Sequence, residues 1–175
     1  MTRLPLPACC LPALLVACAA TPTPTPPAVP DALKPPAGES LLAVVAARGV
    51  QIYECRPKKD DPAAAEWAFV APEAQLYDAQ GRKVGKHYAG PHWEALDGSK
   101  IVGTVKSRAD APVAGAIPWL LLTTKAAGGS GIYSKVTSIQ RINTVGGVSP
   151  AGSCTPGATE RVPYTADYVL FAAAS

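Results

Sequence analysis

The residues best suited to chemistry lie together in one short stretch of the chain. His87, His92, Glu94 and Asp97 fall within eleven residues, and Trp93 lies among them. Two imidazoles and two carboxylates at this spacing can transfer protons or hold a divalent cation, and an exposed indole can stack on a ligand ring. We therefore take these five side chains as the candidate ligand-binding site.

The spacing of these residues matches no established metal or catalytic motif. It differs from HExxH, and the HxE that begins at His92 lacks the PCxxC partner of zinc deaminases. The glycine-rich stretch 129–134 lacks the last glycine of a dinucleotide fingerprint. We therefore expect no metal and no cofactor and assign no catalytic residue. A turn-rich loop with a structural role is the alternative to a binding site.

The elements that position this stretch are expected to be short antiparallel strands. Apolar runs are short and bounded by turn residues, and Gly and Pro, at 15 and 19 residues, supply many breaks. Strands are predicted at residues 41–47, 49–55, 66–70, 75–78, 83–88, 100–108, 117–125, 136–143 and 164–171, with 90–98 as a loop. Residues 41–55 could also form one strand bent at Gly49, and a helix over 41–48 or 136–143 is a further alternative. The pattern predicts an all-β fold, an antiparallel β-sandwich or small barrel of about 8–10 short strands with little helix.

The first 38 residues indicate export and anchoring. A basic start and an apolar run end in LVAC (15–18), which resembles a bacterial lipobox. This predicts a lipoprotein signal peptide at 1–17 and lipidation of Cys18, with an ordinary secretory signal as the alternative. Seven of residues 19–38 are proline, which favours an extended tether. Residues 18–38 are therefore expected to be the lipid anchor and tether, and residues 39–175 one globular β domain.

Cysteine usage fits an exported protein. Cys9 and Cys10 lie in the predicted signal peptide, which leaves Cys55 and Cys154 in the domain. An even pair in an oxidising compartment predicts a disulfide between them, with two buried free thiols as the alternative. A second pairing is expected between Arg141 and Asp167, because buried charges need partners.

Six blocks of sequence resemble a known family. GVQIYECR (49–56), APEAQLYDAQG (71–81), VGKHYAGPHWEALDGS (84–99), IPWLLL (117–122), SIQRINTVGG (138–147) and VPYTADY (162–168) occur in the family's order. The chain is similar, over nearly all of residues 41–171, to a family of exported bacterial and fungal proteins catalogued only as a domain of unknown function. The resemblance implies no activity.

Charge and hydropathy restrict the partners. The net charge is +3 and scattered, whereas nucleic-acid binders show a clustered basic face, so we expect no nucleic-acid partner. Membrane contact is expected through the lipid anchor, at the outer membrane if the source is a diderm bacterium. We therefore predict a lipid-anchored cell-envelope protein of unknown biochemical activity, a binding or structural domain with an envelope glycan or protein as candidate partner. The alternative is a small envelope hydrolase or metal-dependent enzyme that uses the loop 87–97. Oligomeric state stays open.

Overall fold

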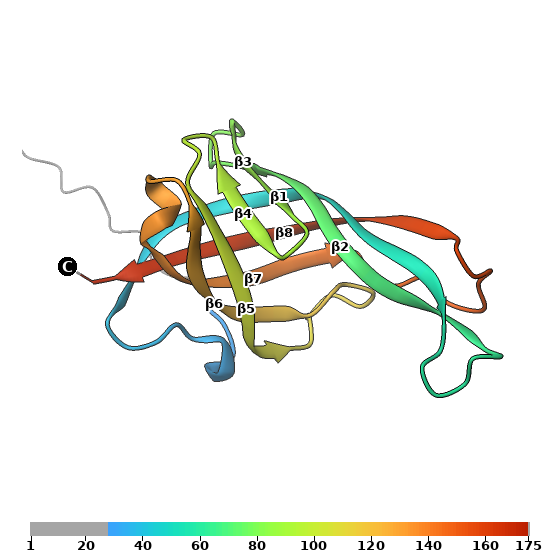
Figure 1. Cartoon of the computed structure of the whole chain (residues 1–175). Coiled ribbons are helices and arrows are strands. Elements are labelled where there is room, and N and C mark those ends of the chain that lie inside the picture. Colours follow the sequence, from blue (N-terminus) through green and yellow to red (C-terminus); the bar gives the residue numbers. More distant parts are fainter. Residues whose placement is uncertain (1–27, 175) are drawn as a thin grey trace, which may run out of the picture.

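The protein folds as a closed β-barrel (Figure 1). The computed structural model describes residues 28–174, so the predicted signal peptide and Cys18 lie outside the described residues. Each strand is antiparallel to its neighbours, and pairing of the first strand with the last closes the sheet. The strands are β1 (Glu39–Pro57), β2 (Ala65–Tyr77), β3 (Lys83–Tyr88), β4 (His92–Ala95), β5 (Lys100–Ala109), β6 (Trp119–Gly128), β7 (Val136–Gly146) and β8 (Thr159–Ala173). The all-β antiparallel prediction is confirmed, and of its two predicted forms, a sandwich or a small barrel, the structure has the barrel.

Several strands are longer than the sequence pattern predicted. β1 passes through Gly49 without a break, because a Cβ there would lie 2.0 Å from the backbone oxygen of Glu73 and only glycine allows this approach. β2 passes through Pro72, close to the bulge at Ile52 and Tyr53. The helix alternatives over 41–48 and 136–143 are wrong, and part of the predicted loop 90–98 is strand β4.

Alternate residues of the strands fill the barrel interior. One end is covered by the short 3-10 helix η2 (Ile132–Lys135), whose Tyr133 is buried in the interior cluster. At the other end, β1, β2 and β8 extend beyond the barrel body as long arms (Figure 1). The cavity described below lies toward this end, because Gln51 of β1 and Phe69 and Val70 of β2 line it.

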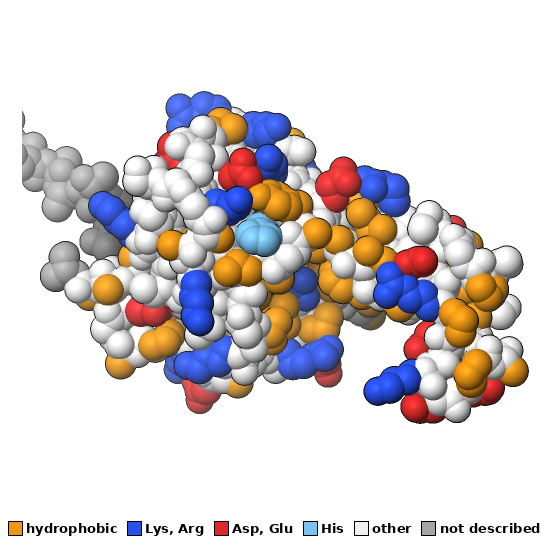
Figure 2. Space-filling view, viewed as in Figure 1, with side chains coloured by type: hydrophobic (Ala, Val, Ile, Leu, Met, Phe, Trp, Pro, Cys, Tyr) orange, Lys and Arg blue, Asp and Glu red, His pale blue; other side chains and the backbone are white. Residues whose placement is uncertain are grey.

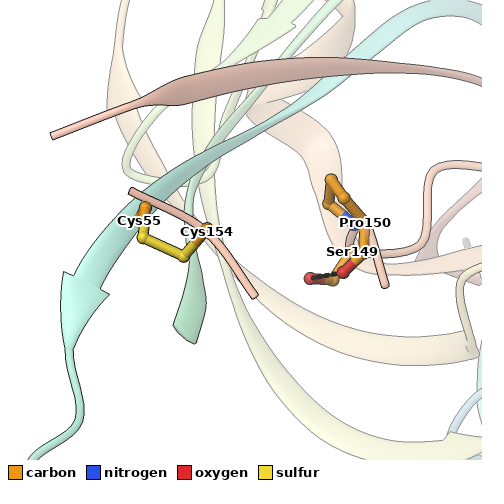
Figure 3. Close-up of a disulfide and its surroundings, with 4 residues drawn as sticks. All are labelled: Cys55, Ser149, Pro150 and Cys154. Atoms are coloured by element: carbon orange, nitrogen blue, oxygen red, sulfur yellow. Dashed lines mark hydrogen bonds between the residues drawn. A yellow bond between two sulfur atoms is a disulfide. The ribbon is translucent and has the colours of Figure 1, made fainter. Parts of the chain in front are cut away.

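A disulfide joins the β1 arm to the loop between β7 and β8. Cys55 of β1 is bonded to Cys154 of the β7–β8 loop, as the sequence predicts, with 5.8 Å between the Cα atoms (Figure 3). Backbone hydrogen bonds lie beside it: the Cys55 amide donates to the Ala158 oxygen at 2.8 Å, and the Gly157 amide donates to the Cys55 oxygen at 2.9 Å. The long β7–β8 loop is therefore held against β1 by covalent and hydrogen bonds.

The segment before β1 packs on the outside of the barrel. It contains the 3-10 helix η1 (Asp31–Leu33), and Leu33 is completely buried. The side chains of Ser107 and Gln140 donate hydrogen bonds to the backbone oxygens of Ala32 and Leu33. We call residues 30–38 the strap. The sequence analysis assigned these residues to the tether, and the structure places them against the barrel wall. No helix among residues 28–174 is long and apolar enough to span a membrane.

Candidate functional site

Two of the five predicted site residues point into the barrel. β3 and β4 form a hairpin in which His87 and Trp93 lie directly opposite each other. Side chains alternate between the two faces of a sheet, so both residues of this pair face inward. The imidazole stacks on the indole with 4.1 Å between ring centroids, and the Tyr168 ring meets both edge-on. His87 and Trp93 are 3% and 1% exposed, so both are part of the interior wall.

His92 and Glu94 lie on the outer face of the same hairpin. The His92 ring stacks on Tyr88, and its Nδ1 lies 2.7 Å from the Ala89 oxygen. The Tyr88 hydroxyl donates to Glu94 at 2.6 Å, and Lys86 lies 3.2 Å from the same carboxylate. The Tyr88 hydrogen bond lowers the pKa of Glu94, and the same bond raises the pKa of Tyr88 to about 12. This is a surface network outside the barrel.

Asp97 holds the β4–β5 turn to η2. Its carboxylate accepts hydrogen bonds from the Ser99 hydroxyl and amide and from the Ile132 amide, at 2.5, 2.9 and 2.9 Å. The Ser99 hydroxyl bond is the main cause of the lowered pKa of Asp97. The five predicted residues therefore lie in three places and do not converge. Within residues 28–174, no group of three or more His, Cys, Asp or Glu residues could hold a metal ion.

A cavity of about 220 Å³ lies beside the inward pair. β2 pairs with β3 only from Ala74 to Tyr77, so the first part of β2 extends past β3 at this end of the barrel. Phe69 and Val70 of that part, with Val105 of β5, line the cavity and are about half exposed. Figure 2 shows apolar side chains gathered in the middle of the face in view. The cavity therefore has an apolar rim and an apolar wall.

Four polar side chains also line the cavity: Gln51, His87, Arg141 and Tyr168. Gln51 is 2% exposed, and its buried Nε2 has no hydrogen-bond partner among the described residues. Arg141 donates from Nε and Nη2 to the Pro118 oxygen, at 3.2 and 2.9 Å. A guanidinium has five N–H groups, so the Pro118 oxygen uses two of them and three point elsewhere.

The expected pair of Arg141 and Asp167 does not form. Arg141 is opposite Tyr168 in the β7–β8 register, whereas Asp167 is opposite Ile142, one position further on. Neighbouring positions on a strand face opposite sides of the sheet, so the two charges lie on different faces. Asp167 instead accepts a hydrogen bond from the Asn143 amide at 2.8 Å. Within residues 28–174, no carboxylate lies within 4.0 Å of the Arg141 guanidinium.

Burial sets the protonation states in the cavity. Burial lowers the pKa of His87 to about 3, and the nearby Arg141 charge adds to the effect, so His87 is neutral near pH 7. Its Nδ1 lies 2.8 Å from the His92 backbone oxygen, which can only accept, so Nδ1 carries the proton and Nε2 is an acceptor. Burial raises the pKa of Tyr168, so that hydroxyl is neutral as well. Arg141 is the one charged group among the lining residues.

The sequence analysis singled out neither Gln51 nor Tyr168 for this site, and it assigned Arg141 to a different role. One signal was available: Gln51, Tyr53 and Cys55 share a face of their strand, and the structure buries all three. The Tyr53 hydroxyl donates to the Gly147 oxygen at 2.7 Å, so this face is the inward one. The position of Arg141 next to Tyr168 depends on the pairing of β7 with β8, which local sequence does not specify.

The described residues form a closed antiparallel barrel with a cavity of about 220 Å³ toward one end. Residues 36–172 match the model of a family described as a protein of unknown function, DUF3455, and the chain belongs to this family. The resemblance drawn from the six sequence blocks is thereby confirmed. No curated protein matches the chain.

Proposed function

We propose that this protein is a lipid-anchored envelope protein whose barrel binds a small, largely apolar ligand. The observation that carries the binding role is the cavity at the barrel end, with its apolar wall and its few inward polar groups. Ligand sites of this composition occur in the mouths of β-barrels. A volume of about 220 Å³ is below the range of roughly 300–1,000 Å³ for drug-sized ligands, so the ligand is a small one.

The geometry favours binding over the enzymatic alternative. A hydrolase or metal-dependent enzyme built on the loop 87–97 needs His87 and His92 to act at one point together with a carboxylate. His87 faces the interior, whereas His92 and Glu94 lie on the outer face of the hairpin. The two histidines that such an enzyme would need at one point therefore lie on opposite faces of the sheet.

A cavity-filling variant tests the binding role. We expect 1-octanol, a small neutral amphiphile, to raise the melting temperature of the purified protein saturably, because a ligand that binds only the folded state stabilises it. Leu120 lines the cavity, so Leu120→Trp should abolish this rise. Leu96 is 70% exposed, so Leu96→Trp is the matched control and should keep it. No rise in the native protein, or an equal rise in Leu120→Trp, would contradict the proposal.

The anchoring part of the proposal is supported by LVAC (15–18) and the proline-rich residues that follow it. Multiple acyl chains hold a protein at a membrane far more firmly than one chain does. Intact mass of the protein from a lipoprotein-competent bacterial host should show an acylated N-terminal Cys18, and Cys18→Ser should abolish the modification. Cys10→Ser, in the predicted signal peptide, is the control that should leave it intact. A mature protein that starts elsewhere with an unmodified N-terminus would exclude lipidation.

A further inference from the structure

The polar groups that line the barrel cavity are mainly hydrogen-bond donors. Arg141 has three N–H groups that are not used by the Pro118 oxygen, and the Gln51 Nε2 has no partner among the described residues. No aspartate or glutamate lines the cavity. A buried donor without a partner, such as the Gln51 Nε2, costs free energy, and the half-buried Arg141 has no carboxylate beside it among the described residues. The cavity is therefore incomplete without an acceptor, and an anionic acceptor fits it best.

We propose that the ligand is a small monocarboxylate, an apolar body whose carboxylate accepts hydrogen bonds from Arg141 and Gln51. This inference rests on the proposed binding function and names its ligand class. A guanidinium binds the two oxygens of a carboxylate side by side, which gives both strength and orientation. The remaining wall, with Trp93, Leu120 and Leu122, is apolar and suits the body of such a ligand.

The position of Arg141 supports this assignment. Burial raises the pKa of three tyrosines, and the positive charge of Arg141 partly offsets this rise in each of them: Tyr53, Tyr164 and Tyr168. Arg141 comes from β7 and lines the cavity together with Gln51 of β1 and Tyr168 of β8. A ligand that enters the cavity meets this charge without an intervening carboxylate.

The same lining disfavours other head groups. An ammonium would face the Arg141 charge with no lining carboxylate to offset the repulsion. Among the lining side chains, the neutral His87 Nε2 and the Gln51 Oε1 are the acceptors that carry no proton, and neither carries a negative charge to offset that of an ammonium. A neutral hydroxyl can accept from Arg141, but such a bond is weaker than one to a charged oxygen. The expected order of affinity is therefore carboxylate, then alcohol, then amine.

Three ligands with the same eight-carbon body test this order. Octanoate, 1-octanol and octylamine are titrated calorimetrically at pH 7 into the native protein and into Arg141→Gln. We expect the native protein to bind octanoate at least about tenfold more tightly than octanol, as a charge-assisted hydrogen bond predicts. Arg141→Gln should remove this preference and leave octanol affinity nearly unchanged. Arg108→Gln, at an exposed arginine of β5, is the control that should change neither affinity.

The outcomes distinguish failure of the carboxylate assignment from failure of the proposed binding function. Equal affinity for octanol and octanoate would overturn the carboxylate assignment while the proposed function stands. Binding of none of the three would overturn both. Arg141 also holds the Pro118 oxygen, so Arg141→Gln must be shown to keep the native circular dichroism. Gln51→Leu provides the second variant: it removes one donor without touching that bond, and it should weaken octanoate binding several-fold. Unchanged octanoate affinity in Gln51→Leu would exclude the two-donor site.

Discussion

Acidification from pH 7 to pH 5 should destabilise the protein through one buried side chain, His87. Burial holds the pKa of His87 at about 3 in the folded state, against about 6.5 for an unfolded histidine. Between these values the unfolded chain binds a proton that the folded chain does not bind. The free energy of unfolding therefore rises with pH across this window, and it falls as the pH is lowered from 6.5 toward 3.

The size of the effect follows from the same two pKa values. The slope is about 1.4 kcal/mol per pH unit for one proton. At pH 5 the His87 contribution is therefore lowered by about 2 kcal/mol relative to its value above pH 6.5. Glu94 and Asp97 have pKa values lowered by their hydrogen bonds, so their stabilising contribution is present above the unfolded carboxyl pKa near 4 and is lost only at lower pH. The range from pH 5 to 7 thus isolates the histidines.

Urea unfolding followed by circular dichroism at pH 7, 6 and 5 measures this slope. His87→Phe keeps an aromatic ring against Trp93 and removes the titrating group, so its stability should lose the histidine-dependent part of the slope. Its absolute stability will also fall, because the His92 oxygen loses a donor, and only the slope is compared. Leu96→Phe, at an exposed position that does not titrate, is the control and should keep the native slope. An equal slope in His87→Phe and the native protein would refute the reasoning.

Three further predictions concern the framework of the barrel. The double variant Cys55→Ser/Cys154→Ser should lose about 4–5 kcal/mol of unfolding free energy in the chain-entropy model, because the bridge spans 99 residues; urea titration measures the loss, and an unchanged midpoint would exclude a stabilising bridge. Gly103→Ala should lower the melting temperature and shift Trp93 fluorescence, because its Cβ would lie 2.8 Å from the indole; native values of both would contradict this packing. Leu33→Ala should cost about 2–5 kcal/mol if the strap is part of the folded unit, and native stability would show that it is not.

The fold class and the disulfide could be predicted because they depend on local pattern and on residue count. Short apolar runs between turn residues predict strands, and two cysteines allow one intramolecular pairing. Strand lengths were underestimated because Pro72 was taken as a break and continuity through Gly49 was left open, whereas a nearby bulge and a close approach of β2 accommodate these residues. Barrel closure was not decided, since the pairing of β1 with β8 joins the two ends of the domain and has no local signature.

The site shows why proximity in sequence was a poor guide here. His87, His92, Glu94 and Asp97 are close in the chain. The first three lie on strands, where neighbouring residues face opposite sides of the sheet, and Asp97 lies in the turn that follows β4. The donors that do share a space, Gln51 and Arg141, are 90 positions apart and are brought together by closure of the sheet. A closed barrel thus places one charge and one amide inside an apolar wall. Because the wall is apolar and the charge is single, recognition of a ligand should depend strongly on its head group and only weakly on the shape of its body.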